Sequence, residues 1–131
     1  WSHGYTGEVY FTNATTDATP FSTLSITLPV GINAFDLYVQ PNVFSTFNIS
    51  VAASNNSIIT QAVNGVGGAQ YFGFYSDDPL TSLTTITINA QSQANGFAFG
   101  ELRLASPIPT PALLPGLLGL GLGIWRKCKD A

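Results

Sequence analysis

The residues of this chain that could carry out chemistry are few and scattered. There is one histidine, His3, and no Gly-x-Ser-x-Gly sequence, so the usual signature of a serine hydrolase is absent from the sequence. Glycoside hydrolysis needs two convergent carboxylates, and Asp36 and Glu101 fall in mid-strand positions on outward faces. Glu101 has a nearer expected partner in Arg103, two residues along the same strand. We therefore predict that the protein is not an enzyme and uses no cofactor.

Asp77 and Asp78 are the one candidate for a metal site. Two adjacent carboxylates in a loop could bind Ca²⁺ together with backbone carbonyls. A solvated acidic turn before Pro79 explains the same residues, and both interpretations stay open. Cys128 is the single cysteine, which excludes an intramolecular disulfide and a cysteine metal site.

Aromatic side chains form the one group suited to binding. By alternation, six of them are expected on the side of their strands away from the core: Tyr10, Tyr38, Tyr71, Tyr75, Phe97 and Phe99. Aromatic rings on an uncharged sheet face can stack on sugar rings, while neighbouring Asn, Gln and Asp side chains bond to hydroxyls. We predict glycan contact at Tyr38, Tyr71 and Tyr75. Two alternatives are that this face is the core of a second sheet, or that it contacts other copies of the protein.

Eight short segments with alternating apolar and polar residues must position these side chains. The clearest lies at 22–28, where Leu24, Ile26 and Leu28 face one way and Ser and Thr the other. The predicted strands are 8–12, 22–28, 34–40, 44–52, 57–63, 70–76, 83–89 and 96–104. They indicate an all-β fold over residues 1–106, an antiparallel β-sandwich that is jelly-roll-like, with an up-and-down barrel as the alternative.

The charge of residues 1–106 excludes one class of partner. This part contains six acidic residues and one basic residue, a net charge of −5. Such a surface repels phosphate backbones, so we predict no nucleic-acid binding. Only 8% of the chain is charged, and a surface that relies on Ser, Thr, Asn and Gln favours an extracellular setting. Because the chain contains no methionine, we expect a processed product or a fragment, with any export signal upstream of Trp1.

Residues 107–131 differ in composition and form a predicted tail: a Pro-Thr-Pro-Ala element, an apolar run and a basic cluster. As a helix, residues 112–125 would reach only ~21 Å against a hydrocarbon core of ~30 Å. We predict a short C-terminal hydrophobic helix that anchors in a membrane, and the Gly119-x-x-x-Gly123 spacing would allow close helix packing. Cations after Trp125 place the C-terminus on the cytoplasmic side. The predicted anchor and stop-transfer residues are Leu113, Leu114, Leu117, Leu118, Leu120, Leu122, Ile124, Trp125, Arg126, Lys127 and Lys129.

This order of parts resembles the C-terminal sorting signal of PEP-CTERM-class exported proteins, in the Pro-Thr-Pro-Ala variant found mostly in cyanobacteria. The sorting motif is Pro109, Thr110, Pro111 and Ala112. The resemblance implies export, recognition by an exosortase-like membrane enzyme that cleaves near the motif, and delivery to the cell surface or extracellular matrix. Thr110 stands where the family usually has Glu, and Cys128 interrupts the basic run. Cleavage and retention of the tail therefore both stay open.

The sequence leaves three functions open. Residues 67–88 and 96–104 resemble, more loosely, the small β-rich domains that precede such tails. We expect a non-enzymatic surface or matrix protein that self-associates into a homo-oligomer. The second hypothesis is a carbohydrate-binding module for surface polysaccharide, and the third is a membrane-retained accessory subunit whose uncleaved tail helix packs in a larger complex.

Overall fold

The computed structural model describes residues 1, 4–12, 22–78 and 80–108. The sorting motif, the predicted hydrophobic helix and all anchor and stop-transfer residues fall within 109–131, outside the described residues. His3 also lies outside them.

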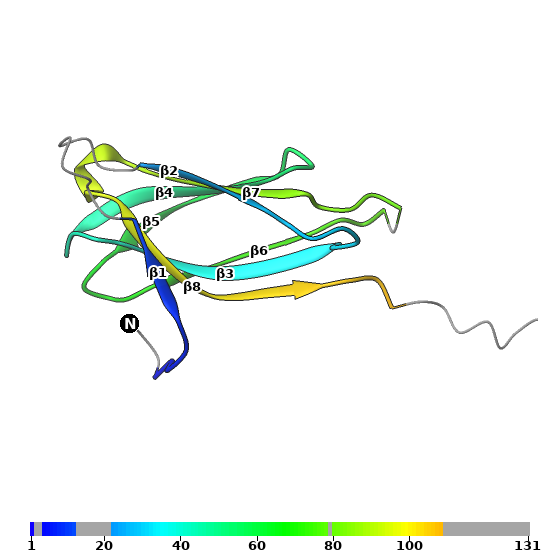
Figure 1. Cartoon of the computed structure of the whole chain (residues 1–131). Coiled ribbons are helices and arrows are strands. Elements are labelled where there is room, and N and C mark those ends of the chain that lie inside the picture. Colours follow the sequence, from blue (N-terminus) through cyan, green and yellow to red (C-terminus); the bar gives the residue numbers. More distant parts are fainter. Residues whose placement is uncertain (2–3, 13–21, 79, 109–131) are drawn as a thin grey trace, which may run out of the picture.

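Eight strands form two antiparallel sheets that lie one over the other (Figure 1). The first sheet has the order β1 (Val9–Phe11), β8 (Phe97–Ala105), β3 (Ala34–Pro41) and β6 (Gln70–Tyr75). The second has the order β2 (Thr23–Thr27), β7 (Thr85–Ala90), β4 (Thr46–Ala53) and β5 (Ile58–Asn64). A 3₁₀ turn, η1 (Ser92–Ala94), leads from β7 to β8. The predicted all-β sandwich of eight strands is confirmed, and the two separate sheets argue against a closed barrel.

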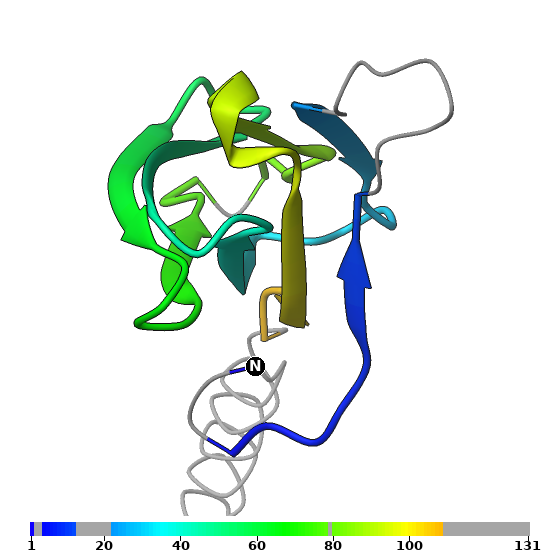
Figure 2. The ribbon, with the colours of Figure 1, turned by 90° about the vertical axis from the view of Figure 1, so that its left-hand side faces the viewer.

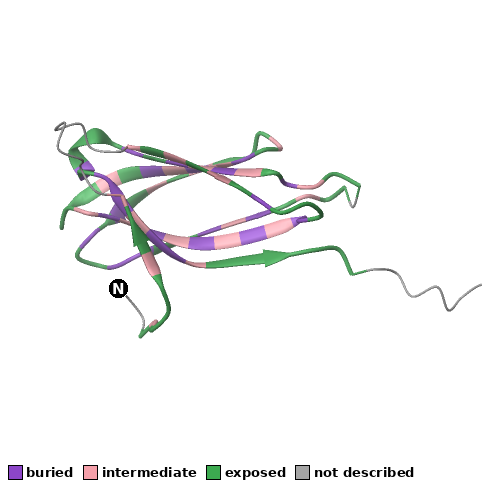
Figure 3. Cartoon of the chain, viewed as in Figure 1, coloured by how far each residue is buried: buried purple, intermediate pink, exposed green. Residues whose placement is uncertain are grey.

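Alternating side chains build the core between the sheets. Along β3, Phe35, Leu37 and Val39 are buried, whereas Asp36 and the residues that alternate with it are half-buried on the other side, as Figure 3 shows. Each fully buried aliphatic or aromatic side chain contributes roughly 1.5–3 kcal/mol through loss of apolar surface to water. The core faces predicted for segments 22–28 and 34–40 are confirmed.

The face predicted for the aromatic residues of β8 is wrong. Phe97 and Phe99 were expected to face outward, but they are 0% and 9% exposed. They pair with Pro41 and Val39, and directly paired residues share a face, so both rings lie on the inner side. The prediction for Tyr10 is wrong in the same way, because Tyr10 pairs with Phe99 and stacks on it at 5.5 Å, on the inner side of the sheet. Tyr10 belongs to β1, which Figure 2 shows beside β8 at the edge of the sheet. Alternation could not assign this stretch because Gly-Phe-Ala-Phe-Gly contains no polar position.

The register of β8 against β3 shifts by one residue in mid-strand. Gly100 pairs with Tyr38, whereas Arg103 pairs with Asp36, so two residues of β8 oppose one of β3. A bulge of this kind moves every later side chain of the strand to the opposite face. Without it, Arg103 would share the inner face with Phe99; with it, Arg103 lies on the outer face of the sheet.

Glu101 occupies this bulge. Its φ of 55° is left-handed, a conformation that costs a non-glycine residue roughly 1–2 kcal/mol. Its Oε1 accepts a hydrogen bond from the Trp1 indole at 3.2 Å. The pairing predicted for Glu101 with Arg103 gives way to a pair between Arg103 and Asp36 on the neighbouring strand.

Candidate functional site

The outer face of the β1-β8-β3-β6 sheet brings together the three tyrosines predicted for glycan contact. Tyr38 and Tyr71 pair directly across β3 and β6, with ring centroids 5.5 Å apart and planes at 69°. Tyr75 lies on the same face of β6, because Phe72 and Phe74 between these tyrosines point into the core. Alternation within this single strand therefore separates core aromatics from surface aromatics.

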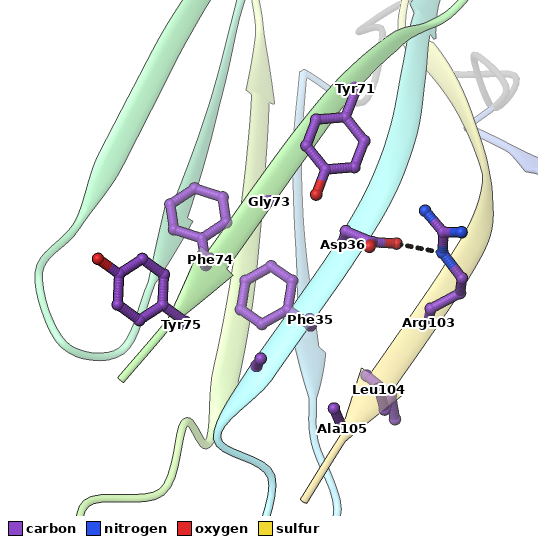
Figure 4. A pocket seen from close by; sticks show the side chains of 10 residues that line it. Phe35, Asp36, Tyr71, Gly73, Phe74, Tyr75, Arg103, Leu104 and Ala105 are labelled. Carbon is purple, nitrogen blue, oxygen red and sulfur yellow. Dashed lines mark hydrogen bonds and ion pairs between the residues drawn. The ribbon is translucent and has the colours of Figure 1, made fainter. Parts of the chain in front are cut away.

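Gly73 opens a hollow between Tyr71 and Tyr75. Figure 4 shows the two rings on β6 with the glycine between them. The hollow has a volume of about 330 Å³ and is also lined by Asp36 and Arg103. The Tyr71 ring folds over Gly73 so closely that a Cβ at this position would collide with the ring and its hydroxyl. The absence of a side chain at Gly73 thus sets both the space in the hollow and the orientation of Tyr71.

An ion pair forms the side of the hollow opposite β6. The Nε of Arg103 donates to Oδ1 of Asp36 at 2.7 Å, drawn as the dashed line in Figure 4. This hydrogen bond and the charge of Asp36 raise the pKa of Arg103 above its usual value. The side chain of Arg103 is 64% exposed and that of Asp36 is 23% exposed. Since Arg103 uses Nε for this bond, its two terminal nitrogens carry further donors toward solvent.

The groups around this hollow are of the kinds that bind ligands. Exposed rings offer flat apolar surfaces, 47% exposed for Tyr71 and 71% for Tyr75. The ion pair places a strong acceptor beside a strong donor, a combination that can bond to adjacent hydroxyls of one ligand. Asp36 is the carboxylate that lines this hollow, whereas glycoside hydrolysis would need a second one opposite it.

Glu101, the second carboxylate considered from the sequence, lies elsewhere. It lines a different hollow of about 360 Å³ together with Tyr5, Glu8 and Tyr10. In that hollow the Tyr10 hydroxyl donates to Oε2 of Glu8 at 2.6 Å, and this bond raises the pKa of Tyr10. The structure therefore does not bring Asp36 and Glu101 into one pocket.

The acidic loop considered for calcium is organised by Asp78. Its carboxylate accepts from the Thr81 hydroxyl at 2.6 Å and from the Leu80 N–H at 2.9 Å. The Thr81 bond is the larger cause, and together these bonds lower the pKa of Asp78. Within the described ranges, no group of three His, Cys, Asp or Glu side chains is placed to hold a metal ion. The Asp78 carboxylate thus stabilises the turn that leads toward β7.

Sequence reasoning missed two parts of this site. Gly73 interrupts an aromatic strand at an outward position, and its spacing midway between Tyr71 and Tyr75 is a signal that could have been used. Arg103 carried no such signal, because only the bulge in β8 brings it to the outer face beside Asp36.

Across the part of the chain that the structure describes, no helix has the length and apolar character needed to cross a membrane. No family model matches the chain, and no curated protein matches it either.

Proposed function

We propose that this protein is an exported, non-catalytic β-sandwich that holds a neutral polysaccharide at the cell surface or in the extracellular matrix. The observation that carries the proposal is the hollow over Gly73, which has exposed tyrosine rings on one side and the Asp36–Arg103 pair on the other. Its volume of about 330 Å³ is at the lower end of the ~300–1,000 Å³ found for small-molecule pockets. A short stretch of a sugar chain suits such a space.

Sugars match the mixed character of this face. A pyranose ring has apolar C–H faces that can cover the rings of Tyr71 and Tyr75, and a rim of hydroxyls that both donate and accept. Asp36 can accept from one hydroxyl while the terminal nitrogens of Arg103 donate to its neighbour. The site therefore supplies the two kinds of contact that a sugar needs.

Charge favours a neutral polymer over an acidic one. Arg103 is the only Lys or Arg before residue 109, and Asp36 already pairs with it. Residues 1–106 carry a net charge of −5, so a carboxylated or sulfated polysaccharide would meet repulsion during approach and little compensation once bound.

We base the proposed delivery of the protein to the cell surface on the sequence of its tail, residues 107–131. Its resemblance to a PEP-CTERM sorting signal supports export, passage through the inner membrane and processing by an exosortase-like enzyme. We also propose that the sandwich belongs to the jelly-roll class. The strand orders β1-β8-β3-β6 and β2-β7-β4-β5 support this, because in each sheet strands of the first half of the chain (β1–β4) alternate with strands of the second half (β5–β8).

Self-association through the same face is the second candidate, because Tyr75 is 71% exposed on a face with few charges. Sedimentation velocity separates the two uses. Self-association predicts a concentration-dependent dimer that Tyr75→Ala abolishes, whereas glycan binding predicts a monomer that captures sugar.

The proposed function is tested by affinity electrophoresis of the full-length chain in gels that contain neutral polysaccharides. Retardation is expected for the natural protein and for Tyr10→Ala, a matched control because Tyr10 is exposed on the inner side of its sheet, away from the hollow. Loss of retardation is expected for Tyr71→Ala and Tyr75→Ala. Equal migration of all four proteins in every gel rejects the proposal. Sorting by the tail is tested separately, by expressing the protein in a host without exosortase. Surface display and trimming of the protein in that host would contradict the proposed sorting.

A further inference from the structure

A further hollow, called here the second hollow, shares lining residues of β6 with the hollow over Gly73, called the first. It has a volume of about 250 Å³ and is lined by Asn55, Ser57, Gly73, Tyr75 and Asp77, among others. Gly73 and Tyr75 line both hollows. β6 is the last strand of its sheet, so this second hollow lies at the open side of the sandwich, where β6 faces the β4–β5 turn.

The backbone of Gly73 points toward this open side. The Ser76 N–H donates to the Asn33 carbonyl at 2.7 Å, which fixes the hydrogen-bonded positions of the β3–β6 ladder. In an antiparallel ladder, bonded and non-bonded pairs alternate. The backbone groups of Tyr71, Gly73 and Tyr75 therefore face away from β3 and toward the free edge.

Side chains from the other sheet close this edge on both sides of Gly73. The amide of Gln61 donates to the Tyr71 carbonyl at 2.8 Å, and the amide of Asn55 lies 3.5 Å from the Tyr75 carbonyl. Such side-chain bonds block pairing with a strand from another chain. The edge is thus unsuited to strand addition, and it separates two hollows that both have Gly73 and Tyr75 in their lining.

We propose that the second hollow is a further sugar subsite, and that a neutral polysaccharide chain crosses β6 beside Tyr75 to occupy both hollows. This inference rests on the proposed function. The Ser57 hydroxyl, the Asp77 carboxylate and the backbone of Gly73 supply the hydroxyl-bonding groups of the second subsite. Tyr75 lines both subsites, so the chain would contact it in each of them.

The occupant is a chain rather than a single sugar, because the two hollows share residues. Neighbouring units of one polymer can fill both without a separate binding event, so the second contact is made at a high effective concentration. Affinity should therefore rise with the number of sugar units until both hollows are filled, and then level off.

The test measures binding of neutral gluco- and manno-oligosaccharides of two to six units to the full-length chain by titration calorimetry. For the natural protein we expect affinity to rise about tenfold or more from the disaccharide to the hexasaccharide. The variant Ser57→Ala/Asp77→Asn should bind the disaccharide normally and lose this rise. Both residues are exposed, so the fold should be retained, which far-UV circular dichroism checks. Ser25→Ala is the matched control, because Ser25 lies exposed in the other sheet and bonds to Thr87 there.

The possible outcomes separate the two proposals. If affinity is flat with chain length, or rises equally in the variant, while Tyr71 and Tyr75 remain necessary for binding, the second subsite is wrong and the proposed function stands. If no oligosaccharide binds at any length, both are overturned.

Discussion

The Nε of Arg103 reaches Oδ1 of Asp36 at 2.7 Å across two strands whose register differs by one residue at that point. The single Lys or Arg before residue 109 is therefore brought to the outer face by a bulge in β8, and it is held there by a carboxylate of β3. The bulge in β8 thus positions a residue of the candidate site, and changes to the bulge should affect ligand binding.

Removing either member of this pair should weaken sugar binding. We expect Asp36→Ala and Arg103→Ala each to lower affinity about tenfold, because each removes a charged hydrogen-bonding group beside the hollow. Thermal stability should change little, since Arg103 is well exposed and such surface pairs contribute little. Calorimetric titration and thermal unfolding of the same samples check both statements. A large fall in stability with unchanged affinity would assign the pair a purely structural role.

The bulge residue should tolerate glycine and resist β-branched residues. Glu101 has a φ of 55°, which glycine adopts without strain and valine does not. We expect Glu101→Gly to leave the free energy of unfolding within about 1 kcal/mol of the natural value, whereas Glu101→Val lowers it by about 1–2 kcal/mol. Urea denaturation measures the difference. Equal stability of the two variants would show that the bulge relaxes in solution.

A methyl group at Gly73 should disturb binding more than folding. In Gly73→Ala the new Cβ must displace the Tyr71 ring, which narrows the hollow and moves one stacking surface. The chain becomes less flexible when unfolded, so the net change in the free energy of unfolding should stay within about 1 kcal/mol. We expect a marked loss of affinity. Gly67→Ala is the matched control, because its Cβ would meet only the Asn64 backbone and side chain at ordinary contact distances of 3.5 and 3.9 Å.

Acid should weaken the turn that Asp78 stabilises. Its folded-state pKa is lowered by the Thr81 hydroxyl and the Leu80 N–H, below the ordinary value of 3.8. The contribution to stability is therefore complete above that value and is lost as the pH falls through the lowered folded-state pKa. Unfolding curves between pH 5 and pH 2 should show a smaller acid-induced loss for Thr81→Val than for the natural protein. Identical pH profiles would contradict the assignment.

The sequence predicted those features that depend on a single strand. Alternation was sufficient for Phe35 and Leu37, and it separated Phe72 from Tyr71 and Tyr75, because polar or small residues mark the opposite face. The buried face of a strand is set by its own alternation of apolar and polar residues, so the sequence of that strand is enough to predict it.

Features that depend on two strands were not predictable in the same way. The partner of Arg103 is set by the register of β8 on β3, and nothing in Gly-Glu-Leu-Arg indicates that Glu101 takes a left-handed conformation. Phe97 and Phe99 were placed on the wrong face because their neighbours are all small or apolar. In both cases packing against strands that are distant in sequence determines the register or the face, and the residues of a single strand do not indicate it.

The most direct test of the central claim compares sugar binding and stability in Tyr75→Ala and Tyr71→Ala with those of Tyr10→Ala, using the full-length chain and neutral oligosaccharides. The account predicts that the two β6 variants lose binding by about tenfold or more while Tyr10→Ala keeps it. For Tyr75, an exposed residue, the free energy of unfolding should change by no more than about 0.5 kcal/mol. Binding that survives in both β6 variants, or that is absent from the natural protein, would contradict the claim that this face holds a polysaccharide.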